Sequence, residues 1–469
     1  MGIFAITGAE RGAVASITYY GLYSLQHRGQ ESAGIVVNDD GVFSIHKATG
    51  LVGDVFTEDA INKLGEGNMA IGHTRYGTLG TRGVANAEPL VVNHIKGRLA
   101  LATDGALVNS GPLRRELELR GMIFHTSSDA EIMSCTIIQE RLYAPSIEVA
   151  VSRAMSRFDG GYCLVLMSPT KIVAARDPNG IHSLCYGKRQ DGSYVVASES
   201  CALDSVSAEF IRELDPGEIV VFKNGEVTSL RDHCEDKPER VCIFEYIYTS
   251  RPDSVIAGCS VQDARRRAGA YLAKAHPVEA DVVVGVPDSG LDAALGYSEE
   301  SGIPYGIGLI KNKYIGRTFI APGQNNREDK VRIKLNPVAS AVKGKRVVLV
   351  DDSIVRGTTS GRIVRLLRAA GATEVHLRSS APKFLNPCYY GTDIDSREML
   401  IACNYSTEEI AKIVGADTLG FLRLEDVEKI AEGSSACGFC TACFDGKYPT
   451  AAPEKYVSKF DNKISESEN

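Results

Sequence analysis

The stretch that decides the fold is Val347-Val348-Leu349-Val350-Asp351-Asp352-Ser353-Ile354-Val355-Arg356-Gly357-Thr358-Thr359-Ser360. Its apolar start predicts a buried strand, which ends at two adjacent carboxylates. A short loop with a glycine and several hydroxyl side chains follows, and then a helix begins. Ligands of open α/β sheets bind at the carboxyl ends of the strands, and such a loop can direct several N–H groups at one phosphate. Asp351 and Asp352 can hold a divalent cation or sugar hydroxyls. A helix cap alone would explain only one of these side chains.

The segments around this stretch alternate between strands and helices. Apolar runs at 281–286, 346–350 and 374–379 predict strands, and Ile363, Val364, Leu366 and Leu367 predict a helix that Gly371 ends. Strand–helix–strand order with buried strands predicts right-handed βαβ units and a parallel sheet. The polar, proline-containing stretch 231–240 reads as a linker.

The residues before the linker have a different pattern. Short apolar segments with frequent glycine turns predict strands, and helices are predicted at 13–26 and 129–141. The strand segments are 34–37, 69–72, 100–102, 162–167 and 194–197. This half is expected to be a sheet-rich α/β or α+β domain.

Composition and charge exclude several classes of protein. The chain has 469 residues, 44% of them hydrophobic, and a formal net charge of −7. The acidic net charge gives no sign of the basic surface that binds nucleic acid or an anionic membrane. No run of 18 apolar residues and no secretory signal occur, so we expect a cytoplasmic protein with no membrane partner.

The phosphate-site stretch resembles the phosphoribosyl pyrophosphate (PRPP) signature of type I phosphoribosyltransferases, in the form found in amidophosphoribosyltransferases. Other matching segments are Gly285–Gly290, Leu309–Ile320, Glu245–Tyr248 and Arg251–Ser254. The resemblance runs from Gly2 to about Pro453. It implies a type I phosphoribosyltransferase parallel-sheet domain that forms 5-phosphoribosylamine and pyrophosphate from PRPP, the first step of de novo purine synthesis.

The resemblance also implies the residues of this site. Mg²⁺ would be bound by Ser289, Asp351 and Asp352. The loop from about Lys311 to Lys334 would close over PRPP. The PRPP-binding residues would be Lys311, Lys313, Arg317, Asp351, Asp352, Ser353, Ile354, Val355, Arg356, Gly357, Thr358, Thr359 and Ser360. Lys313 replaces a usual arginine, which keeps the charge and loses the bidentate fork. A solvated basic loop is the alternative reading of Lys311, Lys313 and Arg317.

The first half resembles a class II glutaminase of the N-terminal-nucleophile type, which implies an αββα sandwich. The matching segments are Leu25–Gly34, Gly72–Thr78 and Ser127–Asp129. The resemblance implies that Arg75 pairs with the glutamine α-carboxylate and Asp129 with its α-amino group. As bare sequence, either residue could belong to an ordinary surface ion pair.

Two catalytic parts of that glutaminase pattern are missing. Met1 stands where the family has its nucleophilic cysteine, before Gly2-Ile3-Phe4. The family's oxyanion-hole Asn-Gly reads Asp104-Gly105 here, which puts a carboxylate where negative charge develops. An engineered or truncated N-terminus would account for Met1 but not for Asp104. We therefore expect glutamine hydrolysis to be absent or impaired, with ammonia as the nitrogen donor.

The cysteines near the C-terminus resemble the iron–sulfur branch of the same family. Cys440 and Cys443 match its tail, and Cys242 and Cys388 match its isolated cysteines. Four thiolates suit a [4Fe–4S] cluster, and zinc is the alternative. Cys437 is an extra cysteine, either an alternative ligand or a spectator.

The expected organisation is a glutamine amidotransferase-like domain over 1–230, a linker over 231–240, a phosphoribosyltransferase domain over 241–420 and a tail over 421–469. The expected partners are PRPP, ammonia or glutamine, and purine nucleotides as feedback inhibitors. A homo-oligomer, dimer or tetramer, is also implied. The alternatives to an enzyme are a non-catalytic PRPP or nucleotide sensor and a scaffold subunit for an active homologue.

Overall fold

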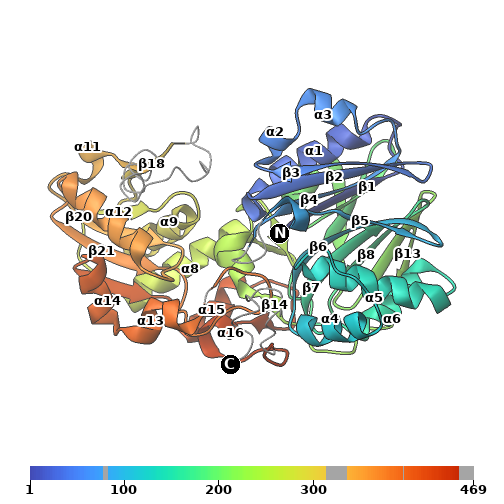
Figure 1. Ribbon diagram of the computed structural model, residues 1–469. Coiled ribbons are helices and arrows are strands. Elements are labelled where there is room, and N and C mark those ends of the chain that lie inside the picture. Colours follow the sequence, from blue (N-terminus) through green and yellow to red (C-terminus); the bar gives the residue numbers. More distant parts are fainter. Residues whose placement is uncertain (78–82, 313–334, 395, 454–469) are drawn as a thin grey trace, which may run out of the picture. The chain divides into compact units, whose positions relative to one another are not determined.

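The computed structural model describes residues 1–77, 83–312, 335–394 and 396–453 (Figure 1). The described chain divides into two compact units. Of the described residues, unit 1 comprises 1–240, the short segment 389–392 and 448–453, and unit 2 comprises 241–388 and 393–447. The chain therefore passes between the units four times, after Arg240, Cys388, Thr392 and Lys447.

Two antiparallel sheets form the centre of unit 1. The first has the order β11-β9-β10-β1-β4-β2-β3 and the second the order β13-β12-β8-β7-β6-β5. The strands of the first sheet are β1 (Gly2–Thr7), β2 (Ser32–Asp39), β3 (Val42–Thr49), β4 (Met69–Arg75), β9 (Cys185–Arg189), β10 (Tyr194–Ala197) and β11 (Ala208–Glu213). Those of the second are β5 (Leu90–His94), β6 (Gly97–Leu107), β7 (Gly160–Met167), β8 (Ile172–Arg176), β12 (Ile219–Lys223) and β13 (Glu226–Leu230).

Alternation along the strands explains the layers. In β1, Phe4 and Ile6 pack on the helical side of the first sheet, whereas Ile3 and Ala5 point into the core between the two sheets. Helices on the outer face of the first sheet are α1 (Val14–Ser24), α2 (Val52–Val55), α3 (Glu58–Asn62) and α7 (Ser200–Asp204). Those on the outer face of the second sheet are α4 (Ser110–Leu119), α5 (Asp129–Tyr143) and α6 (Ile147–Met155). The result is the expected αββα sandwich (Figure 1).

Unit 2 is built on a parallel sheet with the order β17-β20-β21-β22. Its strands are β17 (Val282–Gly285), β20 (Arg346–Asp351), β21 (Glu374–Ser379) and β22 (Thr418–Phe421), and every neighbouring pair is parallel. Helices α8 (Val261–Ala275) and α9 (Gly290–Ser301) pack on one face, and α12 (Thr358–Ala369) and α14 (Thr407–Val414) on the other. The predicted parallel sheet is confirmed.

Short elements complete both units. Three two-stranded ladders are formed by β14 (Val241–Cys242) with β23 (Phe439–Cys440), β15 (Val255–Ile256) with β16 (Cys259–Ser260), and β18 (Leu309–Lys311) with β19 (Leu335–Pro337). The remaining short helices and turns are η1 (Gln26–Arg28), η2 (Val84–Asn86), η3 (Glu245–Thr249), α11 (Ala339–Val342), η4 (Arg397–Met399), α13 (Ile401–Asn404), α15 (Leu424–Val427), η5 (Glu428–Ala431) and α16 (Ala442–Asp445). Within the described ranges, no helix is long and apolar enough to cross a membrane.

Candidate active sites

The acidic pair of unit 2 lies at the carboxyl end of β20. Asp351 is the last residue of the strand and is buried. Burial and the neighbouring Asp352 raise the pKa of Asp351 well above its usual value. Burial also raises the pKa of Asp352, against opposing effects from Ser353, Arg265 and Ser289. Two carboxylates in this position favour a bound cation, because a cation offsets both their burial and their mutual repulsion.

The loop after the acidic pair is anchored by apolar side chains. Ile354 is 1% exposed and lies in the core on one side of the sheet, and the partly buried Val355 packs against the core on the other side. Gly357 has a φ of +74° directly before α12, a conformation that favours glycine. Arg356, Thr358 and Thr359 are exposed, whereas the Ser360 hydroxyl donates to Asp351 Oδ2 at 3.4 Å. The predicted loop residues thus surround the helix N-terminus, where a phosphate is favoured.

Two further predicted residues lie at this end of the sheet. Ser289 directly precedes α9, and a hydrogen bond from it lowers the pKa of Asp352. Gly290 permits this closeness, because a Cβ there would lie 2.6 Å from the Val350 carbonyl oxygen. Lys311, at the end of β18, forms an ion pair with Asp288. Lys313 and Arg317 lie outside the described residues.

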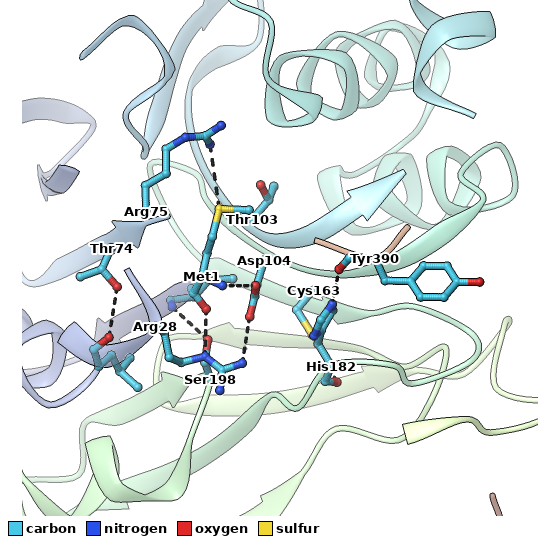
Figure 2. A network of polar contacts seen from close by, with 12 residues as sticks. Met1, Arg28, Thr74, Arg75, Thr103, Asp104, Cys163, His182, Ser198 and Tyr390 are labelled. Atoms are coloured by element: carbon cyan, nitrogen blue, oxygen red, sulfur yellow. Dashed lines mark hydrogen bonds and ion pairs between the residues drawn. The ribbon is translucent and has the colours of Figure 1, made fainter. Parts of the chain in front are cut away.

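The second candidate site lies in unit 1 around Met1 (Figure 2). The N-terminal ammonium forms an ion pair with Asp104 Oδ1. Arg28 donates from Nε to the Met1 carbonyl oxygen at 3.0 Å and lies 3.3 Å from Asp104 Oδ2. Burial alone would raise the pKa of Asp104, but the ammonium, His182 and Arg28 together lower it to about 2. Asp104 is therefore an anion at neutral pH.

The other predicted residues of this half surround Met1. Arg75 is 5% exposed, and its Nη1 lies 4.0 Å from the Met1 sulfur. Gly105 has a φ of +96°. The Asp129 carboxylate accepts a hydrogen bond from the Leu107 backbone N–H at 2.9 Å, and burial raises its pKa to about 6. The structure thus brings Arg75, Asp104 and Gly105 to Met1, and links Asp129 to the same strand, β6.

Sequence reasoning missed two buried acids that hold these residues. Glu88 accepts hydrogen bonds from Arg75 Nη1 at 2.9 Å and from the Thr103 backbone N–H at 2.7 Å. Glu199 accepts from Arg28 Nη1 at 2.6 Å and pairs with His27 at 2.7 Å. Each stands alone in the sequence, so only the folded contacts reveal its role; Arg28 itself lies in a motif that matched the glutaminase pattern.

The cysteines expected to bind a cluster lie close to one another in unit 2. Cys242 and Cys440 are paired residues of the β14–β23 ladder. Burial raises the pKa of Cys443 well above its usual value, and the nearby Cys242, Cys388 and Cys440 raise it further. Cys437 is exposed. Among the described residues, no three or more His, Cys, Asp or Glu side chains converge closely enough for a single metal ion.

Comparison with known proteins supplies the family. Residues 75–205 match the glutamine amidotransferase domain and residues 260–417 the phosphoribosyl transferase domain. The chain is 48% identical to the amidophosphoribosyltransferase of Methanocaldococcus jannaschii over 463 residues, covering 96% of this chain and 97% of that one. It is also 48% identical to the Bacillus subtilis enzyme of the same name over 453 residues, covering 96% and 94%. The chain belongs to the amidophosphoribosyltransferase family.

The fold agrees along the whole chain. A solved structure of glutamine phosphoribosylpyrophosphate amidotransferase from B. subtilis, complexed with ADP and GMP, superposes with a TM-score of 0.90 and 48% identity. The match covers 97% of this chain and 99% of that one. The chain is thus an enzyme of the pentosyltransferase class, an amidophosphoribosyltransferase with amidotransferase and phosphoribosyltransferase domains. The expected family, fold class and enzyme class are confirmed.

Proposed function

We propose that this amidophosphoribosyltransferase forms 5-phosphoribosylamine and pyrophosphate from PRPP with ammonia as the nitrogen donor, and that it hydrolyses glutamine poorly or not at all. The observation that carries the proposal is the ion pair between Asp104 and the N-terminal ammonium. The sensor and scaffold alternatives are not favoured, because the relatives over nearly the whole chain are named as enzymes.

The proposed transferase site is the carboxyl end of the parallel sheet. Asp351, Asp352 and Ser289 would hold Mg²⁺, which prefers oxygen ligands and commonly uses one or two carboxylates together with substrate phosphates and water. When bound, Mg²⁺ neutralises charge on the departing pyrophosphate. The exposed hydroxyls and backbone of residues 353–360 would bind the 5-phosphate. Lys311, and the predicted Lys313 and Arg317, would face the pyrophosphate.

The proposed loss of glutaminase chemistry has two causes. The Met1 thioether has no proton to lose and is no useful nucleophile. The Asp104 carboxylate lies at the position that the resemblance assigns to an oxyanion donor, and removing one such donor costs about 10²–10³ in rate.

A pyrophosphate-release assay with PRPP and Mg²⁺ tests this proposal on anaerobically purified protein, with intact mass establishing whether Met1 is present. We expect turnover with an ammonium salt near pH 8–9 and at least about 100-fold less with glutamine. Comparable turnover with glutamine would contradict the loss of glutaminase activity. Asp352→Asn is the negative control for the transferase site, and Asp426→Asn, at a partly buried carboxylate of the same unit outside the proposed site, is its matched control.

The four cysteines Cys242, Cys388, Cys440 and Cys443 are proposed to bind a [4Fe–4S] cluster. Two observations support this. Cys242 and Cys440 are partners in the β14–β23 ladder, and Cys242, Cys388 and Cys440 all lie near enough to Cys443 to raise its pKa. Anaerobic protein is expected to contain about four iron and four sulfide per chain. Cys440→Ser should lose both, while Cys437→Ser keeps both; zinc without sulfide would contradict the cluster.

The remaining expectations are part of the proposal. The ADP and GMP of the B. subtilis structure support purine nucleotides as feedback inhibitors. A homo-oligomer follows from the family resemblance. The cytoplasmic location and the division into 1–230, 231–240, 241–420 and 421–469 are kept as inferences from the sequence. The start of unit 2 at Val241 supports the end of the linker.

A further inference from the structure

Two segments of unit 1 begin immediately after, or shortly after, proposed cluster ligands. Cys388 is followed at once by the segment 389–392, and Cys443 is followed five residues later by Tyr448, where the chain again belongs to unit 1. Segment 389–392 and residues 448–450 are here called the tyrosine clasp. Both segments of the clasp are therefore covalent continuations of segments that carry the cysteines.

Aromatic contacts hold the two segments of the clasp together. The rings of Tyr389 and Tyr448 stack with their centroids 4.4 Å apart, and Tyr390 meets Tyr448 edge-on at 6.4 Å. The buried Tyr390 hydroxyl also pairs with Thr450 Oγ1 at 2.9 Å. The two segments therefore cannot move independently without breaking these contacts.

The clasp packs directly on the part of strand β6 that contains Asp104 and Gly105. A Cβ on Gly391 would lie 2.9 Å from Gly105 Cα, so the two backbones are in close contact. The Tyr390 carbonyl oxygen pairs with His182 Nε2 at 2.7 Å, while the Tyr390 ring points away from Asp104 (Figure 2). His182 in turn helps to keep Asp104 ionised. The clasp thus contacts this part of β6 both directly and through His182.

The other end of the clasp is tied to the cysteines. Backbone N–H groups of Leu385 and Asn386 both donate to the Cys443 carbonyl oxygen, at 3.0 and 3.1 Å. This brings the chain before Cys388 and the chain at Cys443 together in unit 2. A change in the separation of Cys388 and Cys443 would therefore displace both segments of the clasp.

We propose that the tyrosine clasp transmits occupancy of the four-cysteine site to the Asp104–Gly105 part of strand β6, so that removal of the bound cluster loosens this part of the strand. The inference rests on the proposed cluster. It assigns Tyr389, Tyr390, Gly391 and Tyr448 a conformational role that is separate from ligand binding.

Hydrogen–deuterium exchange with mass spectrometry tests the proposal on the full chain. Iron and sulfide are measured first. In cluster-loaded protein treated anaerobically with an iron chelator, we expect amides of residues 104–107 to exchange at least about tenfold faster. Gly391→Ala should give the same acceleration with iron retained, because the added methyl group separates the clasp from Gly105.

Gly225→Ala is the matched control. Gly225 also has a positive φ, +77°, in unit 1, but a Cβ there meets no atom within 4 Å. It carries the same backbone strain without a contact, so exchange at 104–107 should not change. Tyr448→Leu, which removes the stacking, provides a second test if Gly391→Ala does not fold.

Three results would overturn the proposal. Unchanged exchange at 104–107 after iron loss would exclude transmission. It would not contradict the proposal that the four cysteines bind a cluster. Unchanged exchange in both Gly391→Ala and Tyr448→Leu would exclude the clasp as the route. Protein that contains no iron or sulfide would overturn the cluster and, with it, the clasp's role.

Discussion

At the scale of single residues, Asp104 lies between two positive charges, one of which belongs to the chain's first residue. Its carboxylate contacts the N-terminal ammonium and Arg28. A nucleophile at this position would use the N-terminal amine as its base, and here that amine is in contact with the Asp104 carboxylate. Restoring the nucleophile alone should therefore not restore glutamine hydrolysis.

Inserting a cysteine between Met1 and Gly2 tests this point in two backgrounds. With Asp104 unchanged, glutamate release from glutamine should be at least about 100-fold slower than in the same insertion combined with Asp104→Asn. The comparison requires mass spectrometry to show that the cysteine is the N-terminal residue in both proteins. Equal rates would mean that Asp104 does not obstruct the chemistry.

Asp129 is a residue whose burial favours its protonated form. Its pKa rises from the usual 3.8 to about 6 in the folded protein. The protonated form thus stabilises the fold at low pH, and this contribution is lost as the pH rises through 6. Asp129→Asn should therefore raise the stability of unit 1 at pH 7 by about 1–3 kcal/mol.

Denaturant unfolding at several pH values checks the effect of Asp129→Asn. The stability difference should be near zero below about pH 4, grow between pH 4 and 6 and stay constant above about pH 7. Asp159→Asn, a partly exposed residue of the same unit, is the control. A difference independent of pH would point to the lost charge contacts of Asp129 and not to its burial.

At the scale of elements, helices α8 and α9 approach each other through glycines. A Cβ on Gly269 would overlap the Ala293 carbonyl oxygen, and one on Gly296 would overlap the Arg266 carbonyl oxygen. In α12, by contrast, a Cβ on Gly361 would lie 3.4 Å from its nearest neighbour, an ordinary contact. Gly269 and Gly361 are thus a matched pair of helix glycines, one in a close helix contact and one outside it.

Gly269→Ala should destabilise unit 2 by about 2–3 kcal/mol, because α8 and α9 must separate. Gly361→Ala should change the stability little, or raise it by up to about 1 kcal/mol through helix propensity. The midpoint of denaturant unfolding measures both. Equal effects of the two substitutions would contradict the close helix contact.

The elements also show how far sequence patterns reach. The continuous β-branched runs predicted β17, β20 and β21, because strands covered on both faces must be apolar throughout. Shorter patterns were less informative: the run 100–102 is the middle of β6 (Gly97–Leu107), and the helix predicted over 13–26 ends at Ser24 before the turn η1. Glu88 and Glu199 escaped prediction because a buried acid is recognisable only by its partners in the fold.

At the scale of the whole molecule, the acidic pair should make thermal stability depend on Mg²⁺. Burial and repulsion raise the pKa of Asp351 and Asp352, and a bound cation would relieve both effects. Mg²⁺ at ten times its dissociation constant should stabilise the protein by about 1.4 kcal/mol. Thermal unfolding should show this shift in the wild type and lose it in Asp352→Asn. Unfolding curves that do not change with added Mg²⁺ would argue against a cation at the pair.

The discontinuous make-up of unit 1 also has a consequence for its synthesis. Its sheets are encoded before residue 240, yet the clasp that packs on Gly105 is encoded by residues 389–392 and 448–450. At ribosomal rates of about 5–20 residues per second, the sandwich leaves the ribosome roughly 10–40 s before its last packing segment. During this interval the part of strand β6 around Gly105 lacks the segment that packs on it, which makes the nascent chain a natural client for chaperones.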